Sequence, residues 1–260
     1  MRCILDNGKR LLGMLLSSGI KKPPEVFYYD SISSTNGVAK AAPAGAEKDG
    51  LYIAKSQSAG RGRLGRSFVS EEGGLYMTLR FERTVPPVAA TRATVYTAVA
   101  VCRAIEGLTG LSPKIKWVND ILLGGKKLAG ILCEGVVGEG GLLSVLAVGI
   151  GINVLSAPCD EIRDIATALC EHVRECPDPI TLAAKVTEQM YAMQSMRFSD
   201  VLNLYRERSV IPGKRVRVIK PTGEYFATAV EIDDDGALVI KTDGGITEHL
   251  ATGEISVREL

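Results

Sequence analysis

The chain has 260 residues, which is enough for one large domain with its own core and a small additional module, but not for much more. Apolar residues make up 46% and charged residues 23% of the chain, a balance typical of a folded protein and not of a disordered one. Thirty-one basic and thirty acidic side chains leave a formal charge of +1, so the overall charge does not favour a nucleic-acid binder. Any anionic ligand must therefore be bound by locally clustered cations.

Residues 1 to about 24 are expected to form a short helical stub. Its apolar stretch is interrupted by Gly13 and two serines and has no clean cleavage site, which argues against a secretion signal. No apolar run in the chain reads as long enough to span a bilayer, so we expect a cytoplasmic protein without a membrane partner. Pro23 and Pro24 end the stub and begin an extended connector.

Six cysteines are scattered along the chain without CxxC spacing: Cys3, Cys102, Cys133, Cys159, Cys170 and Cys176. This distribution fits reduced thiols better than a disulfide framework. The group Cys170, His172 and Cys176 raises the alternative of a metal site. On a helix, however, His172 would point about 200° away from Cys170, so ordinary thiols are the favoured interpretation.

Between residues 25 and 211 the patterns of helices and strands are mixed, which predicts an α+β domain. Helices are expected over 35–42, 86–110, 181–196 and 199–208, and strands over 51–57, 75–81, 114–117, 121–132 and 142–154. Gly124-Gly125 is expected to form a two-residue hairpin turn. Pro212-Gly213 marks a boundary, and short strands over 214–220, 225–232, 237–242 and 254–260 predict a small barrel after it.

The loop Gly60–Arg66, GRGRLGR, is the segment best suited to hold an anion. Its arginines offer planar forks of donors, and its glycines let backbone N–H groups approach an anion closely. The alternative is a solvated basic loop. The segment also matches the dinucleotide fingerprint GxGxxG, but that motif needs a helix directly after the glycines, and RSFVSEEGGLYMTL does not predict one.

Residues 116–120, KWVND, lie at the end of a predicted strand that leads through the Gly-Gly turn to Lys127. Strict alternation places Lys127 on one face with Ala129 and Ile131, beside small and apolar neighbours. A lysine in such a place can act as a functional cation. The alternative is a lysine at a hairpin tip, as Lys126 next to it would be.

A third segment carries two adjacent glycine positions on one face of a strand. Alternation places on that face Leu143, Val145, Ala147, Gly149, Gly151 and Asn153. The opposite face is fully apolar and is expected to face a core. The bare face could admit a flat ligand with Asn153 at its rim, or it could accept close packing of another element.

Six motifs occur in a defined order over residues 25 to 260: Ser34-Thr35-Asn36, Gln57, GRGRLGR, KWVND, KLAGIL and GIGIN. In this order and spacing the chain resembles the biotin protein ligase family. The resemblance implies a mixed β-sheet catalytic domain flanked by helices at 25–211, of the kind found in class II synthetases and biotin and lipoate ligases. It also implies a C-terminal SH3-like β-barrel at 212–260, with residues 1–24 as an N-terminal stub.

The resemblance further implies an enzyme that activates biotin with ATP to biotinyl-5′-AMP and then transfers biotin to a lysine of a biotin carboxyl carrier protein, with Mg²⁺ as cofactor. The implied biotin-binding residues are Ser34, Thr35, Asn36, Gln57, Gly60, Arg61, Gly62, Arg63, Lys127, Gly130, Gly149 and Gly151. The implied ATP-binding residues are Arg63, Arg66, Phe68, Lys116, Asn119, Asp120, Lys127 and Asn153. Lys127, Arg61 and Arg63 are implied to be catalytic, and Asp120 to help position Mg²⁺.

Two related functions are alternatives. A lipoate protein ligase shares the adenylate chemistry, but the GRGRLGR loop argues against it. A biotin-responsive repressor is disfavoured because about 24 residues before the core cannot hold a recognition helix and its supporting fold, so we expect the family form without the N-terminal DNA-binding domain and no DNA partner. A homodimer is left open. Val118 stands where the family usually has proline, and Phe68 where it often has tryptophan, yet Phe68 can still stack on adenine.

Overall fold

The computed structural model describes residues 2–45, 49–156, 162–220, 223–251 and 256–259. Its strands form two separate sheets. The larger sheet has the order β1-β2-β3-β7-β6-β5-β4, and its strands are β1 (Glu25–Ile32), β2 (Gly50–Gln57), β3 (Gly74–Phe81), β4 (Lys114–Lys116), β5 (Asp120–Leu123), β6 (Lys126–Val137) and β7 (Leu143–Asn153). Strands β1 and β2 are parallel and every other neighbouring pair is antiparallel, so the sheet is mixed as expected.

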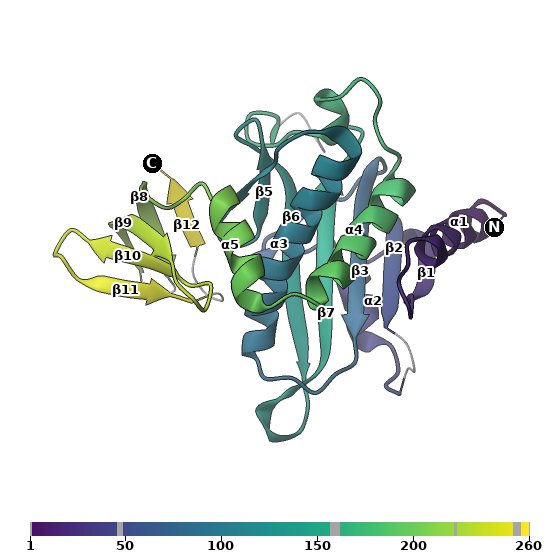
Figure 1. Ribbon diagram of the computed structural model, residues 1–260, viewed down its shortest axis with the longest axis horizontal. Helices are drawn as coiled ribbons and strands as arrows, with labels where there is room; N and C mark the ends of the chain where they lie inside the picture. Colours follow the sequence, from purple (N-terminus) through teal and green to yellow (C-terminus); the bar gives the residue numbers. More distant parts are fainter. Residues whose placement is uncertain (1, 46–48, 157–161, 221–222, 252–255, 260) are drawn as a thin grey trace.

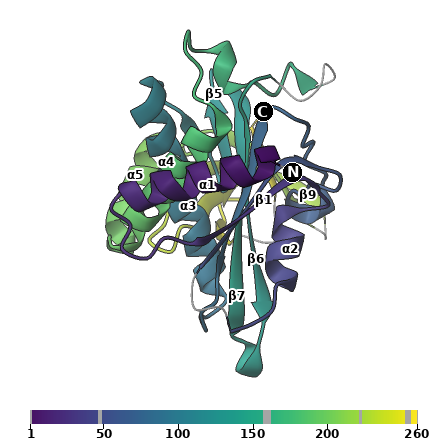
Figure 2. The same ribbon diagram turned by 90° about the vertical axis from the view of Figure 1, so that its right-hand side faces the viewer.

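Helices cover both faces of the large sheet. The helices are α1 (Arg2–Ser17), α2 (Thr35–Ala41), α3 (Val88–Thr109), α4 (Pro179–Gln194) and α5 (Phe198–Arg208). Helices α3, α4 and α5 lie on one face and α2 on the other, while α1 packs beside the edge strand β1 and against α4 (Figures 1 and 2). Ser34 caps α2, because its side chain accepts a hydrogen bond from the Gly37 N–H.

Helix α3 is 22 residues long and forms the centre of the main core, where Ala98, Val101 and Ile105 are fully buried. By length and composition alone it could cross a membrane, so the expectation that no apolar run is long enough was wrong. A core helix passes the same test, and the packing of α3 against β6, α4 and α5 accounts for its apolar composition. The opposite apolar face predicted for β7, with Val148 and Ile152, is buried.

The second sheet lies at the end of the molecule opposite α1 (Figure 1). It is antiparallel with the order β11-β10-β9-β8-β12, and its strands are β8 (Arg215–Lys220), β9 (Gly223–Ile232), β10 (Leu238–Thr242), β11 (Thr247–Leu250) and β12 (Ser256–Glu259). The buried Trp117 indole donates from Nε1 to the Gly236 carbonyl at 3.1 Å, and Arg206 bonds the Ile232 carbonyl at 2.8 Å. These contacts attach the small module to the large domain.

The expected helices and strands are present, with two additions. The segment expected to be an extended connector is strand β1, which pairs in parallel with β2 from Glu25 to Ile32. Strand β11 was not expected either, because its sequence, TEHL, is polar at three of four positions. The cysteine interpretation was wrong at one place: Cys170 and Cys176 form a disulfide, which takes both thiols out of the alternative metal site, whereas Cys102 and Cys133 are free.

Asp178 joins the N-terminal helix to the rest of the fold. Its carboxylate caps α4 by accepting from the N–H groups of Ile180 and Thr181, and it also accepts two hydrogen bonds from the Arg10 guanidinium at 3.0 and 2.9 Å. Burial by itself would raise the pKa of Asp178, but the hydrogen bonds from Arg10 and Thr181 hold it at about 2. The ionised form therefore stabilises the folded state.

We expect Asp178→Ala to lower the free energy of unfolding by about 1 kcal/mol through loss of the cap, and Asp178→Asn to lower it less because asparagine also caps helices. A depressed folded-state pKa contributes stability above the unfolded value, near 3.9, and loses it as the pH falls toward 2. The excess stability of the wild type over Asp178→Asn should thus be constant from pH 7 to 5 and narrow below about pH 4. Urea unfolding of both proteins at these pH values measures the difference in their free energies of unfolding. A difference that does not change with pH would contradict a lowered pKa of Asp178.

Candidate functional site

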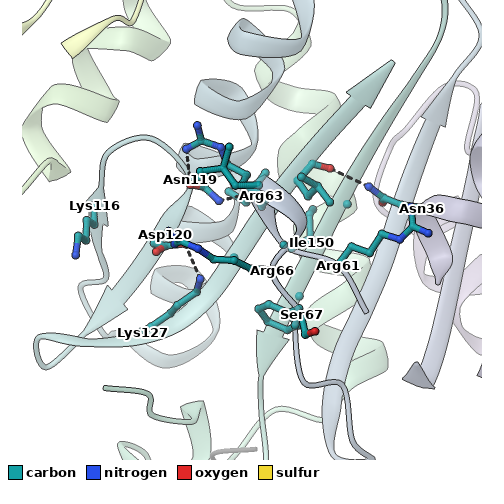
Figure 3. A pocket seen from close by; sticks show the side chains of 18 of the residues that line it. Asn36, Arg61, Arg63, Arg66, Ser67, Lys116, Asn119, Asp120, Lys127 and Ile150 are labelled. Atoms are coloured by element: carbon teal, nitrogen blue, oxygen red, sulfur yellow. Dashed lines mark hydrogen bonds and ion pairs between the residues drawn. The ribbon is translucent and has the colours of Figure 1, made fainter. Parts of the chain in front are cut away.

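A cavity of about 570 Å³ opens where α2, the loop after β2 and the strands β4 to β7 meet. Figure 3 shows that side chains from these separate segments point into it. The predicted residues that line it are Ser34, Thr35, Asn36, Gln57, Arg61, Gly62, Arg63, Arg66, Phe68, Lys116, Asn119, Asp120, Lys127, Gly130, Gly149 and Gly151. Residues that are far apart in the sequence are therefore brought together as predicted.

The glycines of β6 and β7 form a floor that other side chains cover. The side chain of Asn36 lies so close to Gly149 that a Cβ there would collide with its Oδ1. The Phe68 ring lies over Gly151 and Gly130, where an added Cβ would come within 2.6 and 3.2 Å of ring carbons. Of the two sequence interpretations of this face, close packing of another element is present in the structure, and it comes from two residues that line the same cavity.

The loop predicted to bind an anion is folded back on itself as a narrow hairpin. The Phe68 N–H donates to the Gly60 carbonyl at 2.9 Å and the Gly62 N–H to the Arg66 carbonyl at 2.7 Å. Arg63 is carried by a short 3₁₀ turn and donates to Asn119 Oδ1 at 3.3 Å. Burial lowers the pKa of the Arg63 guanidinium, with Asp120 opposing and Arg66 adding to the effect. A half-buried cation of this kind gains more from an anion beside it than an exposed one does.

Lys127 lies in the cavity, but not on the face that alternation predicted. The pairing of β5 with β6 shifts so that Ile121 opposes Ala129 and Leu122 opposes Lys127. One extra residue, Leu128, is thus inserted as a bulge, which turns Lys127 onto the face of Gly130 instead of that of Ala129. Its Nζ lies within 3.3 Å of where a Gly130 Cβ would be and forms an ion pair with Asp120 at 2.7 Å.

A segment that sequence reasoning did not include completes one wall. The Lys127 N–H donates to the Ile165 carbonyl at 2.8 Å, and the Thr167 N–H donates to the Lys127 carbonyl at 3.0 Å. Asp164 and Ile165 consequently line the cavity beside Lys127. The other lining residues that were missed are Leu64, Ser67, Trp117, Leu122, Gly125, Ile131, Leu132 and Ile150. Most are apolar or contribute only small side chains, so no chemical signal in the sequence distinguished them.

Two predicted residues do not line the cavity. Asn153 is buried, and its amide donates to the Thr167 carbonyl at 3.1 Å, so it supports the wall segment instead of standing at the rim. Gly60 packs against the Phe68 carbonyl and the Ser70 hydroxyl. It allows the loop to close.

A chain of hydrogen-bonded side chains forms the other end of the cavity wall. Gln57 Oε1 is 3.1 Å from the Thr35 hydroxyl, which is 2.9 Å from that of Thr78, and the latter is 2.6 Å from Asn36 Oδ1. The Asn36 amide in turn donates to Glu134 Oε2 at 2.8 Å. Thr78, Thr35 and Asn36 are buried, so this polar chain has a fixed geometry.

The cavity therefore has two chemically distinct ends. One carries neutral hydrogen-bonding groups, and the other gathers cations that include Arg61, Arg63, Arg66, Lys116 and Lys127. Such a site suits a ligand with a polar neutral ring at one end and anionic groups at the other.

Comparison with known proteins agrees with this geometry. Residues 28–153 match the biotin/lipoate A/B protein ligase family, and residues 212–258 match the biotin protein ligase C-terminal domain. The bifunctional ligase/repressor BirA of Bacillus subtilis is 35% identical over 85% of this chain and 70% of its own length. The chain belongs to the biotin protein ligase family. The biotin-[acetyl-CoA-carboxylase] ligase of Mycobacterium tuberculosis is 34% identical over 85% of both chains.

Solved structures of the family have the same fold. The biotin protein ligase of Aquifex aeolicus in complex with biotin and ATP superposes with a TM-score of 0.75 and 25% identity over 93% of this chain and all of that one. The enzyme of Leishmania major in complex with biotinyl-5-AMP superposes with a TM-score of 0.63, also at 25% identity, over 88% of this chain and all of that one. The expected fold, a helix-flanked mixed sheet with a small C-terminal β module, is confirmed.

The contact between Gly149 and Asn36 makes a prediction about stability. We expect Gly149→Ala to displace the Asn36 amide and break its buried hydrogen bond with Thr78, lowering the free energy of unfolding by about 1–3 kcal/mol. Gly13→Ala is the matched control, because a Cβ on that helical glycine meets nothing within 4 Å, and it should be neutral or stabilising by roughly 0.5–1 kcal/mol. Urea unfolding of both variants tests this; equal stability would contradict close packing at Gly149.

Proposed function

We propose that the protein is an ATP-dependent biotin protein ligase that forms biotinyl-5′-AMP and transfers biotin to a lysine of a biotin carboxyl carrier protein in the cytoplasm. The observation that carries this proposal is the division of one cavity into a neutral hydrogen-bonding end, at Thr35 and Gln57, and a cationic end, at Arg63 and Lys127. Biotin has a neutral cyclic urea at one end and a carboxylate at the other. Family membership and the names of the relatives support the same reaction.

The neutral end fits the ureido ring. A cyclic urea offers two N–H donors and one carbonyl acceptor, and Thr35 and Gln57 supply a hydroxyl and an amide in reach of one another. The Asn36 side chain covers the floor at Gly149, and the apolar residues Ile131 and Leu132 also line the cavity, which suits the rest of a flat bicyclic ligand. The C-terminal domain match favours biotin over lipoate.

The cationic end fits the first chemical step. A biotin carboxylate oxygen attacks the α-phosphorus of ATP, pyrophosphate leaves, and a mixed anhydride forms. Both reactants are anions, so the main task is to offset negative charge and hold the groups in line. Arg61, Arg63 and Lys127 are the cations proposed for this role, with Lys116, Asn119 and the Phe68 ring at the nucleotide.

Mg²⁺ is usually bound through one or two carboxylates together with substrate phosphates. The donor set fits this mode, because Asp120 and Asp164 are the two carboxylates that line the cavity among the residues described. Asp120 is the proposed protein ligand. When bound, the ion would neutralise phosphate charge next to Lys127.

In the second step the neutral amine of the target lysine attacks the biotinyl carbonyl. The acyl C–O bond of the anhydride breaks, AMP leaves with its electron pair, and the amine loses a proton to water as the amide forms. The cations that received the phosphate can stabilise the departing AMP. No covalent enzyme intermediate is needed. The test of the whole proposal is ATP-dependent transfer of labelled biotin to a purified biotin carboxyl carrier domain, with lipoate as competitor. Absence of transfer, or transfer of lipoate in preference, would refute it.

The adjacent lysines of β6 give a matched pair of variants. Lys127 forms the ion pair with Asp120 in the cavity, whereas Lys126 is exposed and donates to the Arg163 carbonyl. We expect Lys127→Ala to slow biotinyl-adenylate formation by roughly 10²–10³-fold, because a cation at the reacting oxygens is lost, and Lys126→Ala to change it little. Pyrophosphate release in single-turnover assays measures both. Wild-type rates in both variants would make Lys127 an ordinary hairpin lysine.

Arg63 is proposed to retain the reactive adenylate until the acceptor docks. Replacement by glycine keeps the loop flexible but removes the guanidinium, and contacts of this type are worth roughly 1.5–3 kcal/mol, or about ten- to a hundredfold in retention. We expect Arg63→Gly to consume ATP with biotin but to label unrelated proteins as well as the acceptor. Mass spectrometry of a protein mixture detects this labelling. A variant with wild-type activity that labels the acceptor alone would show that Arg63 has another role.

A further inference from the structure

The polar chain behind the cavity, Gln57–Thr35–Thr78–Asn36–Glu134, ends on an ion pair that the proposed reaction does not use. Lys40 Nζ donates to Glu134 Oε1 at 2.5 Å, and the Asn36 amide donates to the other carboxylate oxygen at 2.8 Å. Neither Lys40 nor Glu134 lines the cavity. Among the hydrogen-bonded contacts of this pair, Asn36 is the one that joins it to the cavity wall.

At the Glu134 end the direction of the hydrogen bonds is fixed. The Asn36 amide nitrogen faces two groups that can only accept, the Glu134 carboxylate and the Leu132 carbonyl. Burial by itself would raise the pKa of Glu134, but the hydrogen bonds from Lys40 and Asn36 hold that pKa below its ordinary value, so the carboxylate stays ionised. Asn36 consequently cannot turn over, and its Oδ1 must face Thr78.

The Gln57 end is fixed as well. Gln57 Oε1 accepts from the Thr35 backbone N–H at 2.8 Å, and its amide nitrogen donates to the Ser70 hydroxyl at 2.9 Å. The Ser70 hydroxyl proton itself goes to the Phe68 carbonyl. Gln57 therefore presents an acceptor to the Thr35 hydroxyl.

Between these two ends there are three short oxygen–oxygen contacts but only two hydroxyl protons. Asn36 Oδ1 can only accept, so the 2.6 Å contact takes the proton of Thr78. The single proton of Thr35 is then shared between two acceptors, Thr78 Oγ1 at 2.9 Å and Gln57 Oε1 at 3.1 Å. One hydrogen bond is missing, and it is missing where Thr35 and Gln57 line the cavity.

We propose that Glu134, held by Lys40, is a positioning residue that sets the direction of this chain and so makes the cavity wall demand an N–H donor from the ligand. An N–H donated to Gln57 Oε1 lets the Thr35 proton go to Thr78. Gln57, Thr78 and Asn36 then each accept a hydrogen bond, and only the 3.1 Å contact between Thr35 and Gln57 is left without a proton. The inference rests on the proposed function and deepens it, since it selects a cyclic urea over a ring without N–H groups, such as a dithiolane.

Substitution of Glu134 by glutamine tests the direction without removing volume. Lys40 still needs an acceptor and takes the amide oxygen of the new side chain, which leaves an NH₂ group facing the NH₂ group of Asn36. The Leu132 carbonyl still favours the original orientation of Asn36, but the two facing NH₂ groups repel each other, so Asn36 turns over and donates to Thr78 in much of the population. In these molecules the two hydroxyl protons become free to satisfy the contacts at Thr35 and Gln57. We expect Glu134→Gln to raise the KM for biotin about five- to tenfold, with kcat and the KM for ATP unchanged.

Removal of Lys40 should reverse this effect. In the double variant Lys40→Met, Glu134→Gln the amide oxygen is no longer claimed by Lys40 and can face Asn36, which restores the original direction. We expect the KM for biotin to return to within about twofold of wild type, and Lys40→Met alone to stay within that range at pH 8, where Glu134 is ionised. A purely structural role for the ion pair predicts the opposite, because the double variant would then be at least as impaired as Glu134→Gln.

Steady-state kinetics with biotin and with dethiobiotin, which keeps both urea N–H groups, and calorimetric binding of biotin complete the test. Both ligands should lose affinity in parallel in Glu134→Gln. An unchanged KM for biotin in that variant, or no recovery in the double variant, overturns the inference while the ligase function of the wild type stands. A changed kcat or KM for ATP would assign the effect to Arg61, whose charge also acts on Glu134, and would equally overturn it. A wild type that neither binds nor activates biotin would refute both proposals.

Discussion

The lining of the cavity depends on positions in β6 and β7 that carry no side chains, because Asn36 and Phe68 pack directly onto them. A Cβ at Gly149 would collide with Asn36, and one at Gly151 would come within 2.6 Å of the Phe68 ring. Glycine in a strand interior costs roughly 0.5–1 kcal/mol relative to alanine. The large sheet tolerates these two positions because β7 lies in its middle, paired with β3 and β6 along its length, and because the other face of β7 is buried in the core. A stable sheet can thus include glycines that leave room for the side chains that line the cavity.

The second constraint is charge. Arg61, Arg63, Arg66, Lys116 and Lys127 line one cavity in a chain whose net formal charge is +1, so their mutual repulsion must be offset locally. The Asp120 carboxylate forms an ion pair with Lys127, and the Asn119 amide oxygen accepts a hydrogen bond from Arg63. The lowered pKa of Arg63 reflects the cost of burying this cation. An anion bound beside Arg63 would offset that cost.

Motif chemistry in the sequence predicted which residues meet at the cavity, but not how each one lies. Alternation placed Lys127 on the wrong face, because the bulge at Leu128 depends on pairing between strands and leaves no local signal. Alternation also placed Asn153 at the rim of the cavity. Its amide instead donates to the carbonyl of Thr167, which belongs to a later segment of the chain. The contact between Asn36 and Glu134 joins residues 98 positions apart, and Thr78 reads as an ordinary strand threonine. Hydrogen-bond partners of this kind are set by tertiary packing, whereas glycine-rich loops and strand patterns are local.

The same strand connects the two ends of the cavity. Gly149 lies under Asn36 and Gly151 under Phe68, and residues two apart on one face of a strand are separated by about 7 Å. Hydrogen bonding at the neutral end is directional and short in range, so it distinguishes one ring from another, while the attraction of the cations reaches further and accepts any anion. A rigid strand between them fixes the distance at which a ligand must carry its ring and its carboxylate. In the proposed function the polar chain therefore selects the molecule that is held, and the cations act on the carboxylate that this molecule presents.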